Sequence, residues 1–258
     1  MWHDVRMLNA TTNAMLGVLV LCLLASGVWW VVQRPVFTLK TIRVEAAEAT
    51  DLRHVSQSTV RTAALPRIKG NFFTADLNAV RQAFEAVPWV RKASVRREWP
   101  DMLIVKLEEH QPLGTWGEDG RLLSAKGDVF TANLAEAEED GRLAQFFGPD
   151  GSERDVLARY RELQEWLKPL GLVPESVQLS GRYAWTLRLN NGMTVELGRQ
   201  QNETTLKSRV DRLVGIYPQL LTRLQDNRIE SVDMRYPNGF ALKAQGLDLG
   251  LDSNKSKR

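Results

Sequence analysis

The 258-residue chain has little of the chemistry that enzymes and metal proteins use. It has one cysteine, Cys22, so no disulfide can form within the chain and no cluster of thiolates can bind a metal. Its three histidines, His3, His54 and His110, are scattered, with no second ligand at metal-binding spacing. We therefore expect each histidine to be structural or solvated, and we predict no metal and no cofactor.

Catalytic and nucleic-acid-binding signatures are equally sparse. No glycine-rich phosphate loop precedes a helix, and neither GxSxG nor HExxH occurs. Glu108 and Glu109, or the acidic run at 136–140, could form an acid and base pair. However, neighbouring strand residues point to opposite faces, and the acidic run is typical of a solvated loop. The 34 cations and 31 anions are mixed along the chain, which argues against nucleic-acid binding.

One long apolar run stands near the N-terminus. Residues 14–32 contain no charge, and at about 1.5 Å per residue they form a helix of about 28 Å, enough to cross a bilayer. Trp29 and Trp30 lie near its end, where indoles prefer the membrane interface. We predict a tail at 1–13 and a transmembrane helix at 14–33. A cleaved signal peptide is the alternative, but the run exceeds the usual signal core of about 7 to 15 residues.

The orientation of the span stays open on charge alone. Arg6 in the tail is offset by Asp4, whereas Arg34, Lys40 and Arg43 follow the span. The positive-inside rule would place the large domain in the cytoplasm, but it loses force when a long domain follows.

The next segment predicts the order strand, helix, helix, strand, strand. A strand at 37–44 precedes helices at 54–65 and 76–87, the second of which we expect Thr74 to cap and Pro88 to end. In the strand that follows, alternation predicts a solvated face and an apolar face. The solvated face comprises Lys92, Ser94, Arg96 and Glu98, and the apolar face comprises Ala93, Val95 and Trp99. Two helices on one face of a three-stranded sheet would bury both helix stripes.

The rest of the chain is mostly strand-like, with two helical stretches. One begins after Ser152 as a possible cap, and the other runs until Pro218 kinks or ends it. A loop at 190–192, with Gly192 left-handed, would pair Leu189 with Met193, Leu187 with Val195 and Trp185 with Leu197.

The same pattern recurs near the C-terminus. A loop at 237–239 would pair Tyr236 with Phe240, Met234 with Leu242 and Val232 with Ala244. We expect the strand at 240–244 to be a sheet edge with unpaired backbone groups.

Several sequence blocks together resemble one known family. They are FxLxxIxV at 37–44, NFFTADL at 71–77, PWVRKASVRREWPDMLIVKLEEHQP at 88–112, and later GRYAWTLRLNNG, VELGR and VDMRYPNGFAL. This combination after a single span resembles the bacterial FtsQ/DivIB family of cell-division proteins. One small departure is His110 before Gln111, which displaces a Glu-Gln pair.

The resemblance implies an α+β fold with a single N-terminal transmembrane helix. A polypeptide-transport-associated (POTRA) domain with the order β-α-α-β-β would occupy 36–109. A β-rich domain with an antiparallel sheet and flanking helices would occupy 110–245, and 246–258 would be a flexible tail. The N-terminus would be cytoplasmic and the main domain periplasmic, in the cell inner membrane at the division septum.

The implied function is that of a noncatalytic divisome scaffold. It would bind FtsB and FtsL, together with other divisome proteins, and help assemble and regulate septal peptidoglycan synthesis. No nucleic acid and no small-molecule substrate are expected. The alternative is a POTRA-containing component of protein export or outer-membrane assembly, although such proteins usually carry several POTRA repeats or a membrane barrel.

The resemblance also implies a binding mode, in which a segment of FtsB adds a strand to the edge of the last sheet. The family's binding residues correspond here to Arg199, Arg235, Tyr236, Asn238 and Gly239. Leu242 lies on the same edge strand. Where the family often has a final aromatic residue, this chain has Ala244, so Phe240 is the candidate replacement.

Other roles for these residues stay open. Arg199 and Arg235 could be ordinary surface cations, and Tyr236 could pack on Phe240 rather than on a partner. The POTRA hairpin and first helix form a second candidate surface, for which the sequence offers no residue-level indication.

Overall fold

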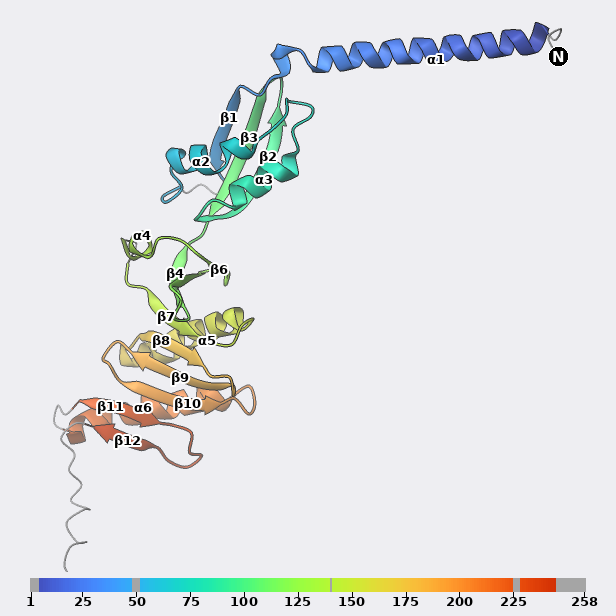
Figure 1. The fold of residues 1–258 in the computed structure, drawn as a ribbon. Helices are drawn as coiled ribbons and strands as arrows, with labels where there is room; N and C mark the ends of the chain where they lie inside the picture. Colours follow the sequence, from blue (N-terminus) through green and yellow to red (C-terminus); the bar gives the residue numbers. More distant parts are fainter. Residues whose placement is uncertain (1–4, 48–51, 140, 225–227, 245–258) are drawn as a thin grey trace, which may run out of the picture. The chain divides into compact units, whose positions relative to one another are not determined.

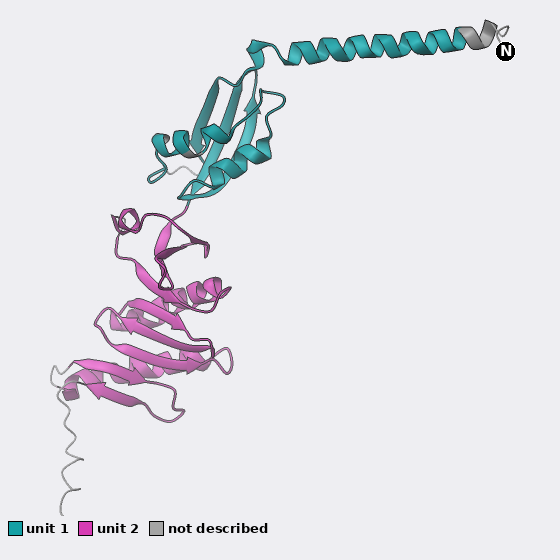
Figure 2. Cartoon of the chain, viewed as in Figure 1, with its two compact units in different colours: residues 1–109 teal, residues 110–258 magenta. Residues whose placement is uncertain are grey.

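The structure, a computed structural model, describes residues 5–47, 52–139, 141–224 and 228–244 of the chain (Figure 1). It divides into two compact units, residues 1–109 and 110–258, which are described separately (Figure 2). The predicted flexible tail at 246–258 lies outside the described residues, as do residues 1–4 of the predicted N-terminal tail.

The first unit begins with a long apolar helix. Its elements are α1 (Val5–Val32), η1 (Pro35–Phe37), β1 (Thr41–Ala46), α2 (Gln57–Ala63), η2 (Leu65–Arg67), α3 (Leu77–Glu85), β2 (Val90–Glu98) and β3 (Met102–Glu109). An 18-residue stretch within residues 9–32 of α1 has a mean hydropathy of 2.4, and the helix is long enough to cross a membrane. Met15 and Leu23 are 76% and 64% exposed, so the protein itself gives these side chains no apolar partner. Lipid would supply one.

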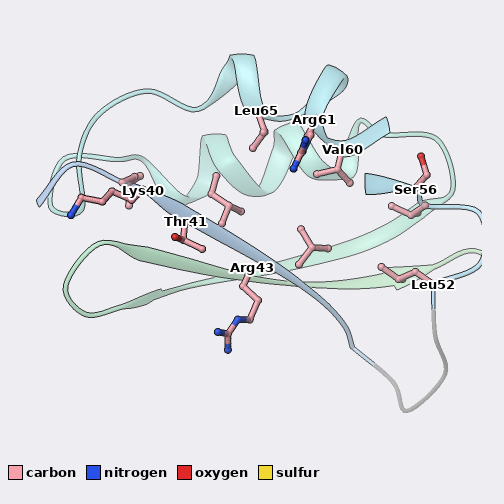
Figure 3. Close-up of a pocket in the computed structure, with 12 residues that line it drawn as sticks. Lys40, Thr41, Arg43, Leu52, Ser56, Val60, Arg61 and Leu65 are labelled. Carbon is pink, nitrogen blue, oxygen red and sulfur yellow. The ribbon is translucent and has the colours of Figure 1, made fainter. Parts of the chain in front are cut away.

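The order strand, helix, helix, strand, strand is confirmed. The sheet has the order β1-β3-β2, with β1 parallel and β2 antiparallel to β3. Helices α2 and α3 lie on one face of it (Figures 1 and 3). Leu103, Val105 and Leu107 of β3 are at most 1% exposed, and Phe84 of α3 is fully buried. The predicted apolar face of the last strand therefore forms the core of this unit.

Two local predictions in this unit are wrong. Asp76, not Thr74, caps α3, because its carboxylate accepts hydrogen bonds from the N–H groups of Asn78 and Ala79. Thr74 instead bonds with Asn71. Trp99 is not on the buried face but is 74% exposed. Strand β2 ends at Glu98, so the alternation of the strand stops before Trp99, which belongs to the turn.

The second unit is built on one nine-stranded sheet. Its elements are β4 (Pro112–Trp116), β5 (Arg121–Ser124), β6 (Val129–Phe130), α4 (Leu134–Glu139), β7 (Ala144–Phe147), α5 (Glu153–Leu167), η3 (Lys168–Leu170), β8 (Pro174–Leu179), β9 (Ala184–Leu189), β10 (Thr194–Arg199), α6 (Thr205–Leu224), β11 (Ile229–Asp233) and β12 (Ala241–Ala244). The strand order is β12-β11-β10-β9-β8-β7-β4-β5-β6.

The α+β class is confirmed, but the sheet is mixed rather than antiparallel throughout. Strands β7 and β8 are parallel, as are β10 and β11, and also β4 and β7. Helices α5 and α6 connect the first two of these pairs. A parallel pair needs such a crossover, whereas an antiparallel pair can be joined by a short turn.

Helices α5 and α6 bury their apolar stripes in the core of the second unit. The buried residues of the two stripes are Val156, Tyr160, Leu163, Leu167, Leu206, Val210, Leu213 and Tyr217. Helix α6 continues through Pro218 to Leu224, so the proline does not end it. Ser152 stands at the N-cap position of α5, but its side chain makes no cap hydrogen bond. Its hydroxyl donates to the carbonyl of Pro149 instead.

The predicted loop at 190–192 is confirmed. The Leu189 N–H donates to the Met193 carbonyl at 2.9 Å, and Gly192 has a φ of 84°, which strains residues with a side chain. Leu187 faces Val195 as expected. Beyond that point a β-bulge shifts the register, and Trp185 faces Gly198 rather than Leu197.

Candidate protein-binding edge of the second unit

The sheet of the second unit ends at β12. Among the described strands, β11 is its only hydrogen-bonded neighbour. Leu242 and Ala244 pack partly buried against the core, while Ala241 and Lys243 are exposed. An edge strand of this kind presents a row of backbone N–H and C=O groups that can pair with another chain.

The predicted register of β12 is wrong. Val232 faces Leu242 and Asp233 faces Ala241, so the connection spans residues 234–240 rather than 237–239. Met234 stays with the core and with β10: its side chain is fully buried and its N–H donates to the Glu196 carbonyl. Residue 234 therefore continues the parallel pairing with β10, whereas the pairing of β11 with β12 ends at Asp233.

The longer connection, residues 234–240, is here called the edge loop. Tyr236 and Phe240 do not form the predicted cross-strand pair and are 54% and 37% exposed. Asn238 is exposed and Gly239 half-buried. Gly239 does not have a positive φ, and a Cβ there would meet nothing within 4 Å. The fold of this chain therefore does not require glycine at 239.

A buried arginine of α6 organises this end of the sheet. Arg209 is only 8% exposed, and its Nη1 donates to the carbonyls of Leu197 and Arg199 at 2.5 and 2.9 Å. Its Nη2 reaches the Arg235 carbonyl at 3.5 Å. Burial lowers the pKa of its guanidinium. The Arg209 guanidinium thus supplies donors to two backbone carbonyls at the end of β10.

A second arginine of α6 holds the edge loop. Arg212 Nη1 donates to the carbonyls of Tyr236 and Pro237, at 3.1 and 2.5 Å. Because Arg209 and Arg212 are three residues apart, they lie on the same side of the helix. Helix α6 thus fixes both the end of β10 and the loop that leads into β12.

Arg235 makes a dense ionic cluster at the end of β11. Its Nε and Nη2 contact Asp233 at 2.9 and 2.6 Å, and its Nη2 lies 3.0 Å from Glu196. The hydrogen bond from Arg235 lowers the pKa of Asp233. The stem of Arg235 crosses Gly198, where φ is 71° and a Cβ would lie 2.7 Å from Arg235 Cγ. Arg235 is therefore engaged within its own chain.

The fold brings most of the predicted site residues to one end of the sheet. Arg199 ends β10 and Arg235 follows β11, and Arg209 bonds to the backbone carbonyls of both. The Arg199 side chain is exposed and has no ion pair among the described residues. Leu242 lies farther along β12, opposite Val232.

The organising residues Arg209, Arg212 and Asp233 were missed from the sequence. The helical periodicity of this segment identifies the apolar stripe Leu206, Val210 and Leu213, but it does not identify the cation beside that stripe. An arginine next to a buried position of a helix predicts a buried hydrogen-bond network, because a cation placed there must find buried acceptors.

Comparisons with known proteins identify the family. Residues 114–235 match the model "Cell division protein FtsQ/DivIB, C-terminal", and residues 37–110 match "POTRA domain, FtsQ-type". The cell division protein FtsQ of Burkholderia pseudomallei is 49% identical over 258 residues, the full length of both chains. This chain belongs to the FtsQ/DivIB family of cell-division proteins. FtsQ of Bordetella pertussis is 42% identical, over 94% of this chain and 92% of that one. FtsQ of Neisseria gonorrhoeae is 31% identical, over 94% and 95%.

The FtsQ-type POTRA unit has a groove of its own. It lies between β1 and α2, with a volume of about 810 Å³ (Figure 3). Ile42 and Val44 of β1 and Val60 of α2 contribute to its apolar lining, and Arg61 adds a cation. The groove borders the outer edge of the sheet, because β1 pairs only with β3 among the described strands. Its lining includes residues of α2, the first helix of the second candidate surface, and none of the β2–β3 hairpin.

The carboxylates that could have formed an acid and base pair have structural partners. Glu109 accepts hydrogen bonds from the N–H groups of His54 and Val55 at 2.6 and 2.9 Å, joining the start of α2 to the end of β3. Glu108 forms an ion pair with Arg91 at 2.9 Å. Within the described residues, no group of three or more His, Cys, Asp or Glu could hold a metal ion.

Proposed function

We propose that this FtsQ/DivIB-family protein is a noncatalytic scaffold of the divisome. Helix α1 anchors it in the inner membrane with the N-terminus in the cytoplasm, and both folded units work in the periplasm at the septum. The family membership, the single apolar helix and the structural use of Glu108 and Glu109 support this proposal. The scaffold binds FtsB and FtsL and helps control septal peptidoglycan synthesis.

The observation that carries the proposed binding mode is the position of β12 at the end of the sheet. A segment of FtsB pairs with β12 by strand addition, in which backbone hydrogen bonds supply affinity and flanking side chains supply specificity. Gly239 supports strand addition at this edge. The fold itself does not require glycine there, and the space around Gly239 is open. Glycine in such a place often marks the close approach of another backbone.

The side chains around β12 have different roles in the proposed binding of the partner. Tyr236 and Phe240 are exposed aromatic anchors at the start of the edge, and aromatic residues commonly dominate interface energies. Arg199, which has no described ion pair, is the cation that meets an acidic residue of the partner. Arg235 acts indirectly, because its guanidinium is engaged by Asp233 and Glu196 and positions the edge loop.

Affinity measurements on the full-length chain in nanodiscs test the proposed edge. Phe240→Glu and Tyr236→Ala should weaken FtsB binding, each by about tenfold or more, as expected for aromatic anchors. Leu134→Glu is the matched control for Phe240→Glu, since Leu134 of α4 is an apolar residue of the second unit with nearly the same exposure, 38%. It should leave affinity unchanged. Unchanged binding in a folded Phe240→Glu variant would place the contact elsewhere.

A second measurement separates strand addition from side-chain docking. Synthetic FtsB segments carrying one N-methyl group at successive positions remove one backbone donor each without changing a side chain. Strand addition predicts losses at alternate positions only, because successive N–H groups of a strand point to opposite sides. Uniform tolerance would refute it. Cleavage of peptidoglycan by the chain, abolished by Glu109→Gln, would instead establish an enzyme.

A further inference from the structure

The end of the POTRA unit beside α1 exposes several apolar side chains. Trp99, at the turn between β2 and β3, is 74% exposed, Val36 is 58% exposed and Phe73 is 47% exposed. A single exposed apolar residue is ordinary on a protein surface. These three come from segments that are far apart in the sequence, and contacts within the unit bring those segments together.

Hydrogen bonds tie two of the segments to the last turn of α1. Asn71 Nδ2 donates to the carbonyl of Val32 at 2.8 Å, and the Phe72 N–H donates to the carbonyl of Phe37 at 2.8 Å. Arg97 Nε then donates to the Phe72 carbonyl at 2.7 Å, which connects the end of β2 to the same loop. The loop around Asn71 and the segment after α1 are thus held at the point where α1 ends.

The β2–β3 turn is attached to the same place. The Lys40 N–H donates to the Asp101 carbonyl at 3.0 Å, and the Lys40 ammonium pairs with the Asp101 carboxylate at 3.0 Å. Trp99 is two residues from both Arg97 and Asp101, which places it within about 7 Å of each along the chain. Trp99, Val36 and Phe73 therefore belong to one surface around the end of α1, here called the helix-proximal surface.

The chemistry of this surface fits a lipid interface. The headgroup layer on each side of a bilayer is about 5 to 8 Å thick, and indole rings prefer it. Arg34, two residues before Val36, and Lys69, two residues before Asn71, are exposed cations, and Arg34 lies 3.4 Å over the ring of Trp30 at the end of α1. Cations near the membrane surface attract anionic headgroups.

We propose that the helix-proximal surface docks on the membrane, with Trp99 inserted among the lipid headgroups of the leaflet in which α1 ends. The bilayer is the binding partner that we propose for this surface, because the hydrogen bond from Asn71 to Val32 holds the surface at the end of the apolar helix. Docking would restrain how the POTRA unit stands on the membrane, which a helix and a short linker alone would leave free. This inference requires α1 to cross the bilayer and is independent of what binds β12.

A pair of fluorescent labels on β2 tests the contact in the full-length chain. After Cys22→Ser, a single cysteine is introduced by Glu98→Cys or by Ser94→Cys and labelled with a nitrobenzoxadiazole group. Both residues lie on the exposed face of β2. They are about 13 Å apart along the strand, and only the first is next to Trp99. The chain is placed in nanodiscs of phosphatidylcholine and phosphatidylglycerol, some of whose lipids carry a nitroxide near the headgroup.

We expect the nitroxide lipid to quench the label at 98 about threefold more than the label at 94, since quenching falls steeply over the thickness of the interface. Adding Trp99→Asp should reduce quenching at 98 to the level at 94, whereas Trp99→Phe should retain most of it. Trp99 is exposed, so neither change should unfold the unit. Equal quenching at the two positions, or no effect of Trp99→Asp, would overturn the proposal.

Two controls keep the outcome interpretable. In parallel proteins that keep Cys22 and carry only the Trp99 substitutions, a label on Cys22, which is exposed on α1, should be quenched by an acyl-chain nitroxide, which verifies that α1 is inserted. FtsB affinity should stay within about twofold in Trp99→Asp, because Trp99 and β12 belong to different folded units and substitutions at sites with no shared partners are usually independent. A label at 98 that is protected only when a protein partner is added would also count against lipid docking.

Discussion

Replacing Arg209 by methionine is the sharpest test of how this protein holds its edge strand. The substitution keeps much of the side-chain volume but removes both short hydrogen bonds to the carbonyls of Leu197 and Arg199 and the longer one to Arg235. Because Arg209 is buried, water cannot easily replace the lost donors.

The magnitude follows from two opposing effects. Hydrogen bonds from a charged donor are worth about 1.5 to 3 kcal/mol each, so the two short bonds together contribute about 3 to 6 kcal/mol. Burial in the protein disfavours the charged guanidinium and lowers the pKa of Arg209, which shows that the buried charge carries a desolvation cost. Removing the charge recovers part of that cost. We therefore expect Arg209→Met to lower the free energy of unfolding of the second unit by about 2 to 4 kcal/mol.

Urea unfolding of the full-length chain in detergent measures the loss, and amide hydrogen exchange locates it. Exchange should accelerate most in residues 197–200 and 235–244, where the strand ends and edge lie. Arg212→Met is the matched control, because Arg212 bonds to the carbonyls of two exposed loop residues. It should increase exchange in the edge loop and lower stability by less than about 1 kcal/mol. Equal effects of the two substitutions would refute the central role of Arg209.

Two further predictions concern the ionic cluster behind the edge. Gly198→Ala should destabilise the second unit by about 1 to 3 kcal/mol, since alanine is strained at φ 71° and its Cβ would displace the Arg235 stem. Thermal unfolding measures this loss, and FtsB binding should weaken in the same variant. A Gly198→Ala protein as stable as the native chain would contradict this account of the bulge. The hydrogen bond from Arg235 lowers the pKa of Asp233, so ionised Asp233 stabilises the fold above its ordinary pKa of 3.8. That stability should disappear as the pH falls from 3.8 through the lowered value. Stability measured from pH 7 to 2 should therefore change less in Asp233→Asn than in the native chain, and identical pH profiles would contradict the assignment.

Local sequence patterns predicted most of the secondary elements, because each is encoded by neighbouring residues, but they missed α4, which lies where a solvated loop was expected. Uncharged residues 14–32 predict a spanning helix, and period-two alternation correctly placed Leu103, Val105 and Leu107 on one buried face. The loop ending at Gly192 was also predictable, since only one register puts all its apolar partners together. Helix ends were less predictable because several residues near the start of α3 could cap it.

The errors fall where distant contacts decide the outcome. A local hairpin rule predicts that Met234 pairs with Leu242, but in the structure Leu242 pairs with Val232. Met234 is buried in the core, and its N–H donates to the Glu196 carbonyl of β10. The edge loop is consequently longer, and Tyr236 and Phe240 are left exposed. The predicted partner residues stay predictions, although the fold places Arg199 and Arg235 at the same end of the sheet through Arg209.

Residue patterns along the chain were enough to predict an apolar helix, a unit with the order strand, helix, helix, strand, strand, and a strand-rich unit, because hydrophobic periodicity is a local property, and the family resemblance identified the second of these as a POTRA unit. Only the tertiary structure decided the register of β12, the exposure of Trp99 and the buried position of Arg209. Each of these depends on which backbone groups and core spaces remain available once distant segments have packed. A linear pattern does not contain that information, because every strand register competes with partners from elsewhere in the chain.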